Sequence, residues 1–98
     1  MTNTVADIKK VTENLNSFLC EKNKRYGDSA LNPLSVFSKH VNKDGLSSIN
    51  SILIRLDDKL KRVKNSSTLR KNDIVDITGY LILLCCANGW LDFKDLID

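Results

Sequence analysis

The feature that most constrains the fold is residues 72–89 (NDIVDITGYLILLCCANG), a run that is apolar almost all the way round a helix. A helix without a polar face belongs in the interior of a protein, because it has no side to present to water. Asp73 and Asp76 stand three residues apart near its start, so they share one face. The sequence therefore predicts a central helix that opens with paired carboxylates, with Asn72 as its N-cap and Gly89 as its C-cap.

The rest of the chain also reads as helical. Aliphatic residues recur at spacings of three and four, and no useful stretch alternates with a period of two. This pattern predicts an all-α fold, a four-helix bundle with two long amphipathic helices, one short helix and the buried apolar helix. The helices are expected at residues 4–23, 34–40, 47 or 48–65 and 72–89. Thr4 and Asn32 are the expected caps of the first two.

Each long amphipathic helix carries one apolar stripe that we expect to be buried. The stripe of the first helix is Ile8, Val11, Leu15, Phe18 and Leu19, and that of the third helix is Ile49, Ile52, Leu53, Leu56, Leu60 and Val63. A last short helix is expected from Asp92. The tail contains Trp90, Leu91, Phe93, Leu96 and Ile97, which are too apolar for a free end, so we expect it to dock on its own subunit or on a partner.

The size of the chain indicates a single domain, residues 1–98, whose apolar surface must be partly buried against another chain. A domain of 98 residues buries only roughly 60–65% of the surface of its unfolded chain. An all-round apolar helix in so small a chain predicts that a second copy covers it. We therefore expect a homodimer or a dimer of dimers.

Charge and hydropathy exclude several partners. The net charge of +3 is too small to suggest duplex DNA as a ligand. The first twenty residues are too polar for a signal peptide, and the run 74–87 is too short for a membrane span and contains Asp76. We expect a cytoplasmic protein with no membrane partner.

A basic helix face is the first candidate for binding. Arg55, Asp58, Lys59 and Arg62 are spaced so that they share one face of the third helix. With Lys22, Lys24 and Arg25 from the polar segment 22–33, which we expect to be a loop, they would suit phosphate, since the arginine fork binds two oxygens at once. The alternative is a solvated helix face on which Asp58 acts as a local counter-ion.

The segment 26–29 is the second candidate. Tyr26 can stack on a base beside the flexible Gly27, while Asp28 and Ser29 can bind sugar hydroxyls. The alternative is an ordinary polar turn with the tyrosine folded onto the core.

The acids are the third candidate. Asp58, Asp73 and Asp76 would suit Mg²⁺ if they converge from adjacent helices, because this hard cation takes oxygen ligands. Alternatively, Asp73 is a favourable acid at a helix N-terminus, and Asp76 pairs with Arg55 or Arg62.

Three sequence blocks, with Phe37 between the first two, resemble one known family. Residues 22–31 (KNKRYGDSAL), 54–63 (IRLDDKLKRV) and 72–84 (NDIVDITGYLILL) are similar to small phage and bacterial nucleotide-modification-associated domains, which are related to the all-α MazG-like nucleotide pyrophosphatases. The resemblance implies a helical MazG-like bundle that assembles as an oligomer and handles a nucleotide.

The family's metal motifs are only partly present. MazG-like enzymes hold Mg²⁺ with Glu-Glu-x-x-Glu on one helix and Glu-x-x-Asp on the next. Asp73 and Asp76 match the second pair and Asp58 matches the last acid of the first motif, but Ile54 and Arg55 stand where its other two acids would be. The departure favours a pocket that binds a nucleotide without metal and without cleavage.

Three functions follow as hypotheses. The first is a protein that binds a phosphorylated or cyclic nucleotide, with no cofactor, and that would sequester a nucleotide immune signal in the host cytoplasm if a phage encodes it. The second is an Mg²⁺-dependent nucleoside triphosphate pyrophosphatase whose metal ligands are Asp58, Asp73 and Asp76. The third is a helical protein-interaction module. The expected ligand-binding residues are Lys24, Arg25, Tyr26, Asp28, Ser29, Arg55, Asp58, Lys59, Arg62, Asp73, Asp76 and Tyr80, and no catalytic residue is assigned.

Overall fold

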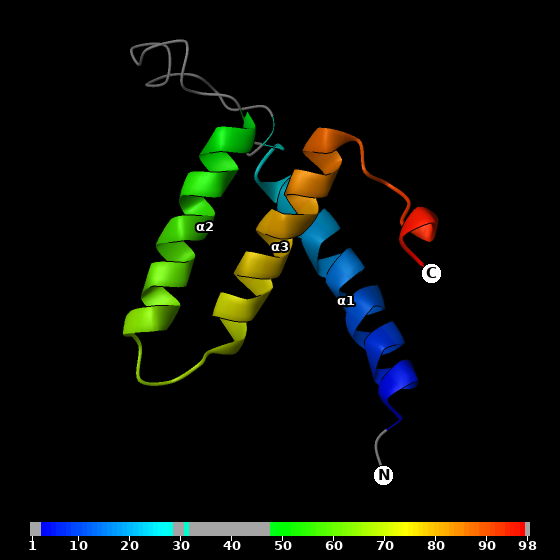
Figure 1. Ribbon diagram of the computed structural model, residues 1–98, viewed down its shortest axis with the longest axis horizontal. Helices are drawn as coiled ribbons and strands as arrows, with labels where there is room; N and C mark the ends of the chain where they lie inside the picture. Colours follow the sequence, from blue (N-terminus) through cyan, green and yellow to red (C-terminus); the bar gives the residue numbers. More distant parts are fainter. Residues whose placement is uncertain (1–2, 29–30, 32–47, 98) are drawn as a thin grey trace.

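The chain is all-helical in the computed structural model, which describes residues 3–28, 31 and 48–97. Its elements are α1 (Thr4–Arg25), α2 (Ser48–Asn65), α3 (Lys71–Asn88) and a 3₁₀ turn, η3 (Lys94–Leu96). In Figure 1, α2 and α3 run side by side as an antiparallel hairpin, and α1 crosses α3. The all-α prediction is confirmed. The predicted short helix at 34–40, its cap Asn32 and Phe37 lie outside the described residues.

Helix α1 begins with an asparagine cap. The Asn3 side-chain oxygen accepts a hydrogen bond from the backbone N–H of Ala6 at 3.2 Å, which satisfies one of the free amides of the first turn. The prediction of Thr4 as the cap is therefore wrong by one residue. The helix continues to Arg25, and its last turn carries three cations that favour a helix C-terminus, Lys22, Lys24 and Arg25.

The predicted burial of the α1 stripe is wrong for the single chain. Ile8 and Val11 are 58% and 63% exposed, and Phe18 is about half exposed. Only Leu15 and Leu19 are half-buried. The reason is geometric: the N-terminal half of α1 projects past the α2–α3 hairpin, so nothing in the described part of the chain covers it (Figure 1).

The α2–α3 hairpin holds the small core. Helix α2 spans Ser48–Asn65, as the sequence predicts, and Ile52 and Leu56 on it are the only buried apolar side chains among the described residues. They are four positions apart and therefore lie on one face. Leu53 and Leu60, which the stripe also includes, remain about half exposed.

Helix α3 begins one residue before the predicted cap. Its N-cap is Arg70 and not Asn72, and the Arg70 side chain binds the carboxylate of Asp73. The Nε and Nη2 atoms of Arg70 lie 3.2 Å and 3.4 Å from Oδ2 and Oδ1 of Asp73. The C-cap prediction is confirmed: Gly89 has a left-handed backbone with φ of 71°, and the N–H groups of Gly89 and Trp90 bind the carbonyls of Cys86 and Cys85.

The prediction that α3 is buried on all sides is wrong for the single chain. The buried residues of α3 are Asp73 and Gly79, whereas Leu81 is 50% exposed and Ile74 and Ile82 are also partly open to solvent. Helices α1 and α2 cover two sides of α3, and no described element covers the remaining side (Figure 1).

No described part of the chain covers the apolar side chains of the tail. The tail forms the 3₁₀ turn Lys94–Leu96 in place of the predicted helix from Asp92, whose Oδ1 atom accepts a hydrogen bond from the Lys94 N–H at 2.9 Å. Its five large apolar side chains, Trp90, Leu91, Phe93, Leu96 and Ile97, are all exposed. Docking on a partner stays a prediction. Across residues 3–28, 31 and 48–97, no helix combines the length and apolar character that crossing a bilayer requires.

Candidate functional site

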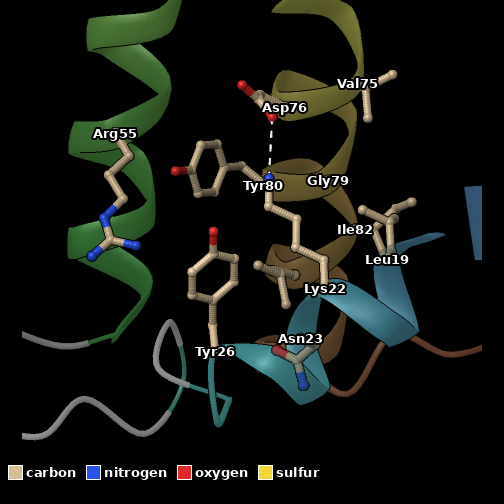
Figure 2. A pocket seen from close by; sticks show the side chains of 11 residues that line it. Leu19, Lys22, Asn23, Tyr26, Arg55, Val75, Asp76, Gly79, Tyr80 and Ile82 are labelled. Atoms are coloured by element: carbon tan, nitrogen blue, oxygen red, sulfur yellow. Dashed lines mark hydrogen bonds and ion pairs between the residues drawn. The ribbon is translucent and has the colours of Figure 1, made fainter. Parts of the chain in front are cut away.

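A pocket of about 360 Å³ lies where the C-terminal end of α1 crosses α3, and α2 forms its opposite side (Figure 2). This volume is at the lower end of the roughly 300–1,000 Å³ found for small-molecule sites. The lining residues are Leu19, Lys22, Asn23 and Tyr26 from α1 and its C-cap, Arg55 from α2, and Val75, Asp76, Gly79, Tyr80, Ile82 and Leu83 from α3.

Gly79 allows α1 to approach α3 closely enough to form this pocket. It is buried, and a Cβ atom at its position would lie 3.1 Å from the Leu19 Cδ2 atom. Lys22 and Tyr26 follow Leu19 by three and seven residues, so they lie on the same face of α1. The close approach at Gly79 therefore brings the lysine and the tyrosine to the pocket.

Asp76 joins all three helices through two ion pairs. Its Oδ1 atom lies 3.3 Å from the Lys22 Nζ atom of α1, and its Oδ2 atom lies 2.9 Å from the Lys59 Nζ atom of α2. Burial raises the pKa of the Asp76 carboxyl, but the hydrogen bonds and charges of Lys59 and Lys22 outweigh it and hold the pKa below its ordinary value of 3.8. Asp76 is therefore a charged carboxylate at neutral pH that already has two cationic partners.

Arg55 has no such partner among the residues that the structure describes. Asp76 does not pair with Arg55 or with Arg62, the two partners that the sequence suggests. Lys22 and Lys59 occupy its two carboxylate oxygens instead. In the described part of the chain no carboxylate lies within ion-pair distance of the Arg55 guanidinium. Figure 2 shows the side chain reaching from α2 toward the side on which the Tyr26 and Tyr80 rings lie.

The structure brings five of the predicted ligand-binding residues together. Tyr26, Arg55, Asp76 and Tyr80 line the pocket, and Lys59 contacts it through Asp76. Tyr26 is the C-cap residue of α1 and Tyr80 belongs to α3, so the two rings come from different segments (Figure 2).

Other predicted residues lie elsewhere. Arg25 binds Glu21 on the surface of α1, with 3.0 Å between Nε and Oε1, and Lys24 is exposed on the same turn. Asp28 has a left-handed backbone with φ of 57° and does not line the pocket. Ser29 lies outside the described residues. Asp58 and Arg62 line a second and more open hollow near the C-terminal end of α2, together with Lys61, Asn65 and Ser66.

The three predicted metal ligands are in separate places. Asp73 is bound by Arg70 with only 2% of its side chain exposed, Asp76 is bound by two lysines, and Asp58 faces the second hollow. Within the described ranges, no group of three or more His, Cys, Asp or Glu side chains could hold one metal ion.

The sequence indicates some pocket residues only once the helix bounds are known. Lys22 and Asn23 are expected at the end of the first helix or in the following loop, but both lie within α1, which continues to Arg25. The spacing of Lys22 and Tyr26, four residues apart, then places them on one side of the helix. Gly79 is among the pocket residues that the sequence does not indicate, although a glycine inside a helical run costs stability relative to alanine and can therefore have a packing reason.

Comparisons with known proteins do not assign this pocket. No protein-family model, no curated protein and no solved structure matches the chain. The function is therefore inferred from the chemistry of the pocket itself.

Proposed function

We propose that the pocket binds a phosphorylated nucleotide, linear or cyclic, and does not cleave it. One observation carries the proposal: two tyrosine rings line the same pocket as an arginine that has no ion-pair partner among the described residues. A tyrosine ring stacks on a base of any identity, and such contacts contribute about 1–3 kcal/mol per base. The planar guanidinium of Arg55 can bind two oxygens of one phosphate.

The charges at the pocket favour an anion. Arg55, Lys22 and Lys59 supply three positive charges, and Asp76 supplies one negative charge. A phosphate that enters the pocket would meet this excess of positive charge in a partly enclosed space, where ionic attraction is stronger than in bulk water.

The state of Asp76 supports binding without cleavage. Its two oxygens are engaged by Lys22 and Lys59, so the carboxylate has no free oxygen directed at a phosphate in the resting pocket. A protein that holds a nucleotide intact lowers the free concentration of that nucleotide. The biological role that we propose is sequestration of a nucleotide signal. This is the role expected if the chain is a phage member of the nucleotide-modification-associated family that it resembles.

We also propose that the chain assembles with copies of itself. Apolar side chains are exposed on α1, on the open side of α3 and in the tail. The described part of the chain buries only two apolar side chains completely enough to form a core, Ile52 and Leu56. Exposed apolar surface of this kind marks contact surfaces between subunits.

The test is calorimetric titration of the protein with ATP, 3′,5′-cyclic AMP and cyclic di-AMP, with EDTA and then with Mg²⁺. Arg55→Ala should weaken binding by about 10–100-fold, since a hydrogen bond to a charged group contributes about 1.5–3 kcal/mol. Lys64→Ala is the matched control, because it removes one exposed positive charge from the same helix away from the pocket. Equal affinity of the wild type and Arg55→Ala would refute the phosphate-binding role.

The same reagents separate the other two functions. Formation of monophosphate and pyrophosphate from a nucleoside triphosphate, lost in Asp73→Asn, would establish the pyrophosphatase. A ligand at 100 times its dissociation constant stabilises the folded state by about 2.7 kcal/mol, which raises the melting temperature of a domain of this size by roughly 10–20 °C. If no nucleotide raises the melting temperature, the protein-interaction module is the better account.

A further inference from the structure

Positive charge reaches the pocket at two separate places. The Arg55 guanidinium comes from α2 on one side of the pocket, whereas the Lys22 ammonium group is held at Asp76 of α3. In Figure 2 these two groups are well apart, and the rings of Tyr26 and Tyr80 lie between them in that view. Lys59 brings a second ammonium group to Asp76. One phosphate at Arg55 would therefore leave the lysine pair unoccupied.

Each place carries an excess of one positive charge. At the first, Arg55 has no ion-pair partner among the described residues. At the second, two lysines share the single carboxylate of Asp76, with N–O distances of 3.3 Å and 2.9 Å. One phosphate at each place would compensate both positive excesses, whereas two adjoining phosphates at one place would leave the other uncompensated.

We propose that the ligand carries two phosphate groups separated by a nucleoside, one bound by Arg55 and the other by the pair Lys22 and Lys59. The base then lies against Tyr26 and Tyr80, between the two anion positions. This inference rests on the proposed nucleotide binding and adds the arrangement of the phosphates. The same chemistry occurs in nucleoside 3′,5′-bisphosphates and in cyclic dinucleotides.

The first experiment compares adenosine 3′,5′-bisphosphate with ADP in the wild-type protein, by calorimetric titration with EDTA present. The two ligands have the same base and the same number of phosphates. They differ in the placement of the phosphates, and the bisphosphate carries about one more negative charge because both of its phosphates are monoesters. The bisphosphate should bind at least about tenfold more tightly. Equal affinity, or tighter binding of ADP, would overturn the proposal. Cyclic di-AMP is titrated in the same way. If it binds more tightly than the bisphosphate, the pocket prefers a cyclic dinucleotide, and if it binds more weakly, the pocket prefers a linear bisphosphate.

The second experiment assigns the two positions with Arg55→Ala and Lys59→Ala. Without Lys59 the Asp76 carboxylate cancels the charge of Lys22, so the second position becomes neutral. Both variants should weaken binding of adenosine 3′,5′-bisphosphate by at least about fivefold, the effect of one unit charge about 4 Å away in bulk water. Only one of the two variants should weaken binding of AMP, because AMP has one phosphate. The control Lys64→Ala should leave both affinities unchanged.

The outcomes distinguish this inference from the proposed function. If both variants weaken AMP, ADP and the bisphosphate to the same extent, the pocket binds nucleotides through one shared anion position, and only the two-position arrangement is refuted. If none of the adenine nucleotides binds, the proposed nucleotide binding is refuted, and the two-position arrangement is refuted with it. Circular dichroism of each variant shows whether its helices are intact. The ligand comparison in the wild type needs no variant, so it remains decisive if a variant does not fold.

Discussion

The contact between Gly79 and Leu19 predicts a measurable coupling between α3 and α1. Gly79 is buried on α3, and a Cβ atom there would lie 3.1 Å from the Leu19 Cδ2 atom. Gly79→Ala therefore has two opposing effects. The helix gains stability because alanine restricts the unfolded chain more than glycine does, and it loses stability because the added methyl group presses on Leu19.

The two effects are similar in size. Replacing glycine by alanine inside a helix stabilises it by about 0.8–1.0 kcal/mol. Displacing the Leu19 side chain from its preferred rotamer costs about 0.5–1.5 kcal/mol. We expect Gly79→Ala alone to change the free energy of unfolding by less than about 0.7 kcal/mol. In a Leu19→Ala background the methyl group meets no other described side chain within 4 Å, so the same change should stabilise by about 1 kcal/mol.

The assay is urea unfolding, followed by circular dichroism at 222 nm, of the wild type, the two single variants and the double variant. The double-mutant cycle should give a coupling energy of about 0.5–1.5 kcal/mol between positions 19 and 79. Identical effects of Gly79→Ala in both backgrounds would show that α1 does not pack on α3 at this point, and the pocket that depends on the crossing would then be wrong as well.

Three further predictions test the ion pairs and the surface. The pKa of Asp76 is lower in the folded than in the unfolded chain, so the ion pairs of Asp76 stabilise the fold fully above the ordinary pKa of 3.8. This stabilisation is lost as the pH falls below that value, and urea unfolding between pH 5 and 2 should show the loss. Asp76→Asn should reduce the dependence of the free energy of unfolding on pH. Arg70→Ala leaves Asp73 buried without its cation and should lower the melting temperature clearly, whereas Arg25→Ala breaks an exposed pair and should change it little. Leu81→Asp should reduce the mass in sedimentation equilibrium, because the half-exposed position 81 would then carry a charge into the proposed subunit contact. An unchanged mass would contradict a contact at this position.

The sequence predicts helix bounds well where a cap has a mechanism of its own. Gly89 closes α3 because only a residue that tolerates a left-handed backbone fits there, and Ser48–Asn65 follows from the spacing of its apolar residues. The sequence does not predict the N-cap where two neighbouring polar residues could both serve as the cap. Asn3 and Thr4 are both acceptable caps, and the choice depends on which side chain meets the free amide of Ala6.

Burial is the property that the sequence predicts least well. The apolar character of α3 shows that the helix needs cover, but not which surface supplies it. Two sides are covered by α1 and α2, and Leu81 on the remaining side is still half exposed in the single chain. The proposed self-assembly would account for the difference, because apolar residues at a contact between copies stay exposed within one copy.

The sequence predicts which residue types line the candidate site better than it predicts which of them form ion pairs. The sequence indicates Tyr26 for its ring, Arg55 for its guanidinium and Asp76 for its carboxylate, and Tyr80 is expected at the site without a role of its own. The structure places all four at one pocket. The pairing depends on how far side chains reach across helices. Lys59 reaches Asp76 from α2, so Arg55, one turn earlier on the same helix, has no ion-pair partner in the described part of the chain.

The way α1 is attached has a consequence for how the pocket opens. Near the pocket α1 is held by the contact of Leu19 with Gly79 and by the ion pair of Lys22 with Asp76, while its N-terminal half lies beyond the hairpin. Local stability therefore falls along α1 from its C-terminal to its N-terminal end, and amide hydrogen exchange should follow this gradient. We therefore expect the α1 wall of the pocket to separate from α3 at a lower free-energy cost than unfolding of the hairpin that holds Ile52 and Leu56.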